Sequence, residues 1–136
     1  MYLLDTVALS EQQRPAPDVG VERFFDSVPV ALMYTSVVVL GEIWRGILGD
    51  PQVARRNRLE RWFDELLVTM EAQTLPITTE VCLLWAELRV AAVGQPLPPV
   101  DALIVATAIV HNLTVVTRNV RDFQRSGALV LSPWDA

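Results

Sequence analysis

Short apolar runs alternate along this chain with longer stretches in which apolar residues follow a helical spacing. Apolar runs that end at polar or turn-forming residues indicate buried strands. Five such runs occupy residues 2–4, 31–36, 74–78, 113–117 and 128–131. Apolar residues at i, i+3, i+4 and i+7 form one face of an amphipathic helix. This spacing predicts helices over residues 21–28, 38–48, 53–70, 80–93 and 100–112, with a short helical turn at 121–127.

Several of these predicted helices show which face should be buried. The expected core positions are Val39, Ile43 and Ile47, then Leu59, Trp62, Phe63 and Leu66, then Val81, Leu84, Trp85 and Leu88. The segment 100–112 is apolar nearly all round, so we expect a buried helix there. The polar, proline-containing stretch 11–20 should be a loop. We also expect Cys82 to be buried, because it stands among apolar neighbours and free cysteines are usually buried.

Strands that alternate with helices require crossover connections, which are typical of a mostly parallel α/β sheet. No repeat, low-complexity tract or linker interrupts the pattern, so we expect a single domain over residues 1–136. In such sheets, functional sites form at the carboxyl ends of the strands, near the point where the strand order changes direction.

Acidic and amide side chains stand at several of these strand exits and helix starts. Asp5 directly follows the first strand, and Glu42 lies in the early turns of the helix after the second. Asp101 opens the helix that begins near residue 100, and both Asn119 and Asp122 follow the fourth strand. We expect these side chains to face one crevice.

The three carboxylates differ in how far a structural role explains them. An acid in the first turn of a helix interacts favourably with the helix dipole, which accounts for Asp101 equally well. Asp5 and Glu42 stand among apolar residues, where an ionised carboxylate is costly.

Carboxylates brought together repel one another, and a hard divalent cation relieves that repulsion. Such a cation can orient a phosphodiester and lower the pKa of a water molecule.

Composition excludes several other classes of protein. The chain has 136 residues, 51% of them hydrophobic, and a formal net charge of -5, so it is neither disordered nor strongly basic. All 11 basic residues are arginine, so a lysine-dependent phosphate loop is impossible. The only histidine, His111, ends an apolar helix and is a poor candidate for a catalytic triad. A lone cysteine forms neither an internal disulfide nor a cysteine-based zinc site.

Targeting and binding signals are weak. No basic segment precedes the first apolar run and no apolar stretch reaches the ~20 residues of a membrane helix, so we expect a cytoplasmic protein without a membrane anchor. Four arginines cluster in the third predicted helix, at Arg55, Arg56, Arg58 and Arg61. They form either a solvated helix face or a contact for RNA phosphates. The pairs Phe24/Phe25 and Trp62/Phe63 suit a core or a dimer contact better than base stacking.

Four segments together resemble the PIN-domain ribonucleases, and more narrowly the VapC-type toxins and their FitB-like branch. They are "LLDTVALSE" at 3–11, "TSVVVLGEIWRGI" at 35–47, "DALIVATAIVHNLTVVTRNVRDF" at 101–123 and "SPW" at 132–134. The resemblance implies a PIN domain, with a parallel five-stranded sheet flanked by helices. It also implies a metal-dependent endoribonuclease toxin, with an RNA substrate, a cognate protein antitoxin and a homodimeric assembly.

The resemblance assigns roles to individual positions. Asp5, Glu42 and Asp101 match the family's metal-binding acids, for Mg²⁺ or Mn²⁺. Thr117 and Asn119 match the polar residues that complete the pocket, and with Thr6 they should position ligands or water by hydrogen bonds. Two positions depart from the family pattern. Val7 stands where many relatives have Asn, and the fourth acidic position is Asn119, so three acids remain.

Two alternatives stay open at this point. A non-catalytic RNA-binding or regulatory PIN domain would share the fold, although the retained set of three acids favours catalysis. Asp122 is either a fourth acid or part of a capping box, in which Asn119 is the N-cap, Asp122 reaches back from position N3, and Gly127 ends the turn.

Overall fold

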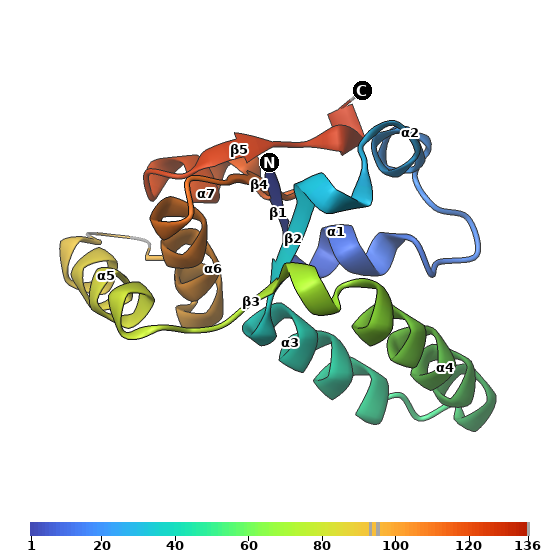
Figure 1. Cartoon of the computed structure of the whole chain (residues 1–136). Coiled ribbons are helices and arrows are strands. Elements are labelled where there is room, and N and C mark those ends of the chain that lie inside the picture. Colours follow the sequence, from blue (N-terminus) through green and yellow to red (C-terminus); the bar gives the residue numbers. More distant parts are fainter. Residues whose placement is uncertain (93, 95, 136) are drawn as a thin grey trace.

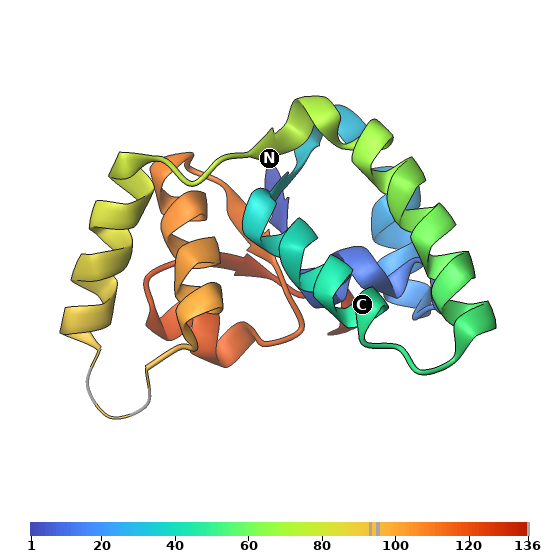
Figure 2. The same ribbon diagram turned by 90° about the horizontal axis from the view of Figure 1, so that it is seen from below.

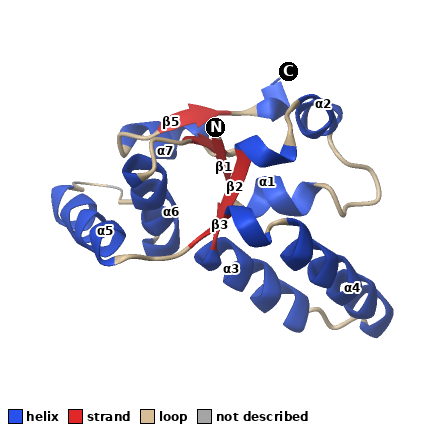
Figure 3. Ribbon diagram, in the orientation of Figure 1, coloured by secondary structure: helices blue, strands red, loops and turns tan. Residues whose placement is uncertain are grey.

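The fold is built on one parallel sheet of five strands, which crosses the middle of the molecule (Figures 1 and 3). The computed structural model describes residues 1–92, 94 and 96–135. The strands are β1 (Tyr2–Leu4), β2 (Met33–Ser36), β3 (Thr74–Leu75), β4 (Thr114–Val116) and β5 (Leu129–Leu131). Their order across the sheet is β3-β2-β1-β4-β5.

The central strand β1 lies between β2 and β4. Tyr2 pairs with Met33 on one side, and Leu4 pairs with Val116 on the other. The chain runs outward from β1 through β2 to β3, and then returns to place β4 on the opposite side of β1. The strand order therefore changes direction beside β1, and the carboxyl ends of the strands at such a point are where functional sites form in parallel sheets.

Helices flank the sheet on both sides (Figures 1 and 2). They are α1 (Thr6–Glu11), α2 (Val19–Ser27), α3 (Val37–Leu48), α4 (Val53–Thr69), α5 (Thr79–Ala91), α6 (Pro99–Val110) and α7 (Val120–Arg125), with short 3₁₀ turns at Val30–Leu32, Glu71–Gln73 and Pro133–Asp135. Helices α5 and α6 pack against each other on one flank, and α3 packs against α1 and α4 on the other. Within the described residues, we find no helix long and apolar enough to cross a membrane.

The sequence pattern predicted this architecture well. All five strands and the five longer predicted helices are present, with ends shifted by a few residues. The predicted end of the helix over 80–93, at residue 93, lies outside the described residues. The strand predicted at 74–78 is only two residues long. The predicted core face of α3 is confirmed, because Val39, Ile43 and Ile47 are all buried. In α5, Val81 is fully buried and Trp85 packs against the core.

Helix α1 was not predicted. The Asp5 side chain caps it by accepting a hydrogen bond from the Ala8 N–H at 2.8 Å, which lets the chain turn directly from strand to helix. Only Ala8, Leu9 and Glu11 of its six residues are buried, so no helical period is visible in so short a segment. As a result, Glu11 belongs to a helix and not to the loop expected over 11–20.

The prediction that Cys82 is buried was wrong, because its side chain is exposed. Val81 is the buried residue at this turn of α5, and the next position along a helix is rotated by about 100°. Cys82 therefore faces away from α6 and the core, although its sequence neighbours are apolar.

Gly20 of α2 lies against the carbonyl oxygen of Pro133, and a Cβ at this position would overlap that oxygen. We expect Gly20→Ala to destabilise the fold by about 1–3 kcal/mol, because backbone has to move to relieve the overlap. Gly46→Ala in α3 is the matched control, since a Cβ there meets nothing within 4 Å and alanine favours helix. Urea denaturation should show a lower midpoint for Gly20→Ala alone; equal midpoints for the two variants would contradict the packing.

Candidate functional site: an acidic crevice at the end of β1

Asp5 lies at the end of the central strand, where β1 passes into α1. Its N–H donates to the Val116 carbonyl of β4 at 3.2 Å, so the backbone is still part of the sheet. Its side chain already acts as the N-cap of α1. Only 7% of the residue is exposed. A carboxylate can stand at this buried strand end because backbone and hydroxyl donors surround it.

Glu42 is brought to Asp5 by the abrupt passage from β2 into α3. Ser36 ends the strand and caps the helix, because its Oγ accepts a hydrogen bond from the Val38 N–H at 3.1 Å. Glu42 follows in the second turn, and its Oε1 accepts a 2.7 Å hydrogen bond from the hydroxyl of Thr6. This bond joins α1 to α3 and fixes the Glu42 carboxylate beside the residue that follows Asp5.

Asp101 and Thr117 complete the crevice from the other side of β1. Asp101 stands in the first turn of α6, after Pro99, and is half-buried. Thr117 directly follows β4 and is fully buried. Its hydroxyl donates to the Asp5 carboxylate and accepts a hydrogen bond from the Asn119 N–H at 3.0 Å. Thr117 therefore positions both Asp5 and the loop that carries Asn119.

The carboxylates act on one another electrostatically. Burial raises the pKa of Asp5 to about 6, the hydrogen bonds from Thr117 and Ala8 lower it, and the negative charges of Asp101 and Glu42 raise it further. Burial also raises the pKa of Asp101, and Glu42 adds to that effect. The structure thus places the three acids that the sequence pattern singled out near enough to one another for their charges to interact.

The donor set suits a hard divalent cation. All three groups are carboxylates, which Mg²⁺ and Mn²⁺ prefer as ligands, and a cation would relieve the repulsion that raises the pKa of Asp5. As the side chains are placed, no three His, Cys, Asp or Glu groups among the described residues converge closely enough to hold one ion. The hydrogen bond from Thr6 directs one oxygen of Glu42 toward α1.

The capping box predicted for Asn119 and Asp122 is absent. Asn119 is the N-cap residue of α7, but its side chain makes no capping hydrogen bond, and its N–H donates to Thr117. Asp122 instead accepts a 2.8 Å hydrogen bond from Arg125. The geometry favours this i,i+3 pair because both side chains project from the same face of α7. Gly127 does end the turn, with a φ of 92°.

Asp122 also contributes to the site at longer range, because its charge adds to the rise in the pKa of Asp101. We expect Asp122→Asn to change the free energy of unfolding by less than about 0.5 kcal/mol, since the lost Arg125 pair is largely exposed. Metal affinity should stay within a few-fold of wild type. A titration in which Asp122→Asn loses Mn²⁺ binding as completely as Asp5→Asn would instead make Asp122 a metal ligand.

Arg45 is a residue that the sequence reasoning missed. It follows Glu42 by one helical turn, its side chain is 84% exposed, and its Nη2 lies 3.9 Å from Glu42 Oε2. The i,i+3 spacing from Glu42 was the available signal. An arginine at this place puts an exposed positive charge beside one of the three acids.

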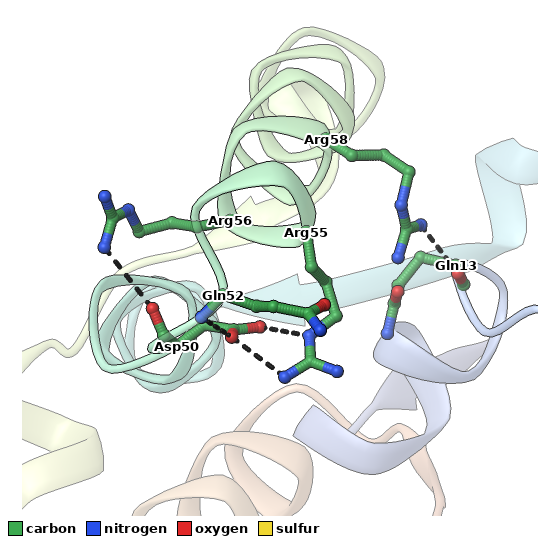
Figure 4. A network of polar contacts seen from close by, with 6 residues as sticks. All are labelled: Gln13, Asp50, Gln52, Arg55, Arg56 and Arg58. Atoms are coloured by element: carbon green, nitrogen blue, oxygen red, sulfur yellow. Dashed lines mark hydrogen bonds and ion pairs between the residues drawn. The ribbon is translucent and has the colours of Figure 1, made fainter.

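The arginine cluster of α4 is partly used within the fold (Figure 4). Arg55 forms a bidentate pair with Asp50, at 2.5 and 2.9 Å, and lowers the pKa of that carboxyl to about 2. Arg56 donates to the Asp50 carbonyl, and Arg58 to the carbonyl of Gln13. These contacts tie the start of α4 to the α3–α4 turn and to the end of α1, which supports the structural interpretation of the cluster.

Comparisons with known proteins agree with this fold. VapC ribonuclease Y4jK of Sinorhizobium fredii is 30% identical over 141 residues, which cover 99% of both chains. Toxin FitB of Neisseria gonorrhoeae is 32% identical and covers 98% of this chain and 99% of its own. The crystal structure of FitAcB from Neisseria gonorrhoeae superposes with a TM-score of 0.93 at 30% identity and covers 100% of both chains. The PIN domain profile matches residues 2–129, and this chain therefore belongs to the PIN domain family.

Proposed function

We propose that this protein is a metal-dependent endoribonuclease, the toxin of a toxin–antitoxin pair, which hydrolyses phosphodiester bonds of RNA. The observation that carries the proposal is the group of three carboxylates, Asp5, Glu42 and Asp101, at the point where the strand order changes direction. The names of two full-length relatives, a ribonuclease and a toxin, support the same activity.

Asp5, Glu42 and Asp101 would hold Mg²⁺ or Mn²⁺. When bound, such an ion neutralises charge on a phosphodiester and supplies a more acidic water as nucleophile. The chain's own residues prepare the ligands. Thr117 and the Ala8 N–H hold the Asp5 carboxylate in one orientation, and Thr6 holds that of Glu42. Preorganised ligands cost little reorganisation at the moment of reaction.

Asn119 has a different role because it carries no charge. Its N–H is fixed by Thr117, which keeps its backbone at the mouth of the crevice. From there its amide would orient a water or an RNA oxygen by hydrogen bonds, without adding to the charge on the ion. Three charged ligands are enough for a hard cation that keeps part of its water shell.

The assembly and place of action follow from the same proposal. We propose that the chain acts as one domain in the cytoplasm, where RNA is available, and that a cognate protein antitoxin covers the crevice. Exposed apolar side chains on α4 and α5, including Val68 at 76% and Leu83 at 64%, supply surface for a homodimer.

Cleavage of RNA in the presence and absence of metal tests the function. We expect the purified protein to cleave RNA with Mg²⁺ or Mn²⁺ and to lose activity in EDTA, because the acids alone repel the phosphate backbone. Addition of excess Mn²⁺ should restore cleavage. RNA binding without any cleavage, under all these conditions, would instead identify a regulatory RNA-binding PIN domain.

A further inference from the structure

A cavity of about 290 Å³ lies beside the acidic crevice, between the C-terminal end of α5, the start of α6 and α7. We call it the α5–α7 cavity. Leu88, Leu97 and Ala102 supply its apolar lining, and Arg89, Arg125 and Ser126 are among its polar residues. Its volume is at the lower end of the ~300–1,000 Å³ typical of small-molecule sites, which suits a ligand the size of one nucleotide.

The α5–α7 cavity adjoins the proposed catalytic acids. Ala102, which lines it, follows Asp101 directly in the first turn of α6. Asp122 also lines the cavity, and its charge acts on Asp101. The cavity therefore lies near Asp101, at the start of α6.

Two guanidinium groups give the cavity a phosphate-binding character. Arg89 is half-buried, and its Nη1 donates to the Leu97 carbonyl at 2.5 Å, which fixes the side chain against the wall. The remaining donors of this guanidinium have no hydrogen-bond partner within the part of the chain that the structure describes. Arg125 also lines the cavity, and its Nη2 donates to Asp122 at 2.8 Å. Planar guanidinium groups bind phosphate oxygens through several donors at once.

We propose that the α5–α7 cavity binds one nucleotide of the RNA strand next to the scissile phosphodiester, with its phosphate on Arg89 and Arg125 and its sugar or base against Leu88 and Leu97. The inference rests on the proposed ribonuclease function and adds a subsite to it. The net charge of the chain is -5, so binding of a polyanion needs local positive groups. Arg89 and Arg125 would supply them beside the acids whose metal ion would hold the reacting phosphodiester.

RNA binding can be measured independently of cleavage. Fluorescence anisotropy of a labelled ten-nucleotide RNA should be recorded in EDTA. All proteins compared carry Asp5→Asn, which prevents cleavage and reduces the repulsion between the acids and the RNA. Arg89→Gln and Arg125→Gln should each weaken binding by ~5–10-fold, and each should reduce the slope of log K against log salt by about 0.7, the value for one lost contact to a single strand. Arg23→Gln, an exposed arginine of α2, is the matched control and should change neither quantity.

A second variant tests the cavity and not only its charge. Ala91→Trp on the wall of the cavity should fill the space and weaken RNA binding while it leaves both arginines in place. Its melting temperature, and that of Arg89→Gln, should show that the fold is kept.

The outcomes separate the possibilities. Unchanged affinity and salt slope in the two arginine variants and in Ala91→Trp would overturn the subsite. Variants that keep RNA binding but lose a protein antitoxin would assign the cavity to that partner and also overturn it. If all three variants weaken RNA binding while the wild type never cleaves RNA with Mn²⁺, the cavity stands as an RNA subsite and the ribonuclease proposal fails.

Discussion

Asp5→Asn and Asp101→Asn should each lower kcat/KM for RNA cleavage by at least about 100-fold. Each substitution removes one of three negative ligands, and a loss of about 3 kcal/mol of stabilisation in the transition state corresponds to that factor. Asparagine has nearly the same shape as aspartate, so the fold and the cap on α1 should persist. Initial rates on a fluorogenic RNA, measured over a range of Mn²⁺ concentrations, give the effect directly.

The control for this prediction is Asp64→Asn, which neutralises an exposed carboxylate on α4 outside the crevice. It should cleave at the wild-type rate. The interpretation fails if Asp101→Asn retains wild-type kcat/KM while its circular dichroism spectrum and melting temperature show a folded protein. Rescue of Asp101→Asn by high Mn²⁺ alone would show that the residue contributes to affinity for the ion and not to its placement.

The fold was largely predictable because its parts follow local rules. Alternation of short apolar runs with helical spacing leaves few arrangements other than a parallel sheet with crossover helices. Strand lengths were less predictable, since pairing with neighbours decides where a strand ends. The segment 74–78 forms only the two paired residues of β3, because β2 offers pairing partners only to Thr74 and Leu75. Helix α1 was missed because its stability comes from the Asp5 cap and from packing on α3.

The site was predictable only in part. Asp5, Glu42 and Asp101 could be chosen because each stands where a strand ends or a helix begins, and parallel strands bring such positions to one edge. The hydrogen bond from Thr6 to Glu42 and the pair formed by Asp122 and Arg125 depend on side-chain geometry. The α5–α7 cavity depends on how three helices pack, which no local pattern encodes. Cys82 is exposed although its neighbour Val81 is buried, because successive residues of α5 point in directions about 100° apart.

The acidic crevice is a place where function opposes stability. Asp5 is buried, capped to α1 and hydrogen-bonded to Thr117, yet its pKa is raised because these contacts do not offset burial and the neighbouring charges. The metal-free fold therefore favours the neutral form of the Asp5 carboxyl, whereas a bound cation would favour its charged form. Such sites are often stabilised by the substitution that destroys their activity.

We therefore expect Asp5→Asn to stabilise the metal-free protein at neutral pH. The pKa of this carboxyl is raised from 3.8 to about 6 in the fold, so ionisation costs stability progressively as the pH rises from about 4 to above 6. At pH 7.5 the full cost applies and amounts to at most about 3 kcal/mol. Asparagine removes the charge but can still accept the Ala8 N–H hydrogen bond. Urea denaturation in EDTA should show a higher midpoint for Asp5→Asn than for wild type at pH 7.5, and little difference near pH 4.

Mn²⁺ should raise the wild-type midpoint more than that of the variant, because an ion bound only by the folded state stabilises it. A variant that is less stable than wild type at pH 7.5, or equally more stable at both pH values, would show that the charge on Asp5 is not the source of the instability.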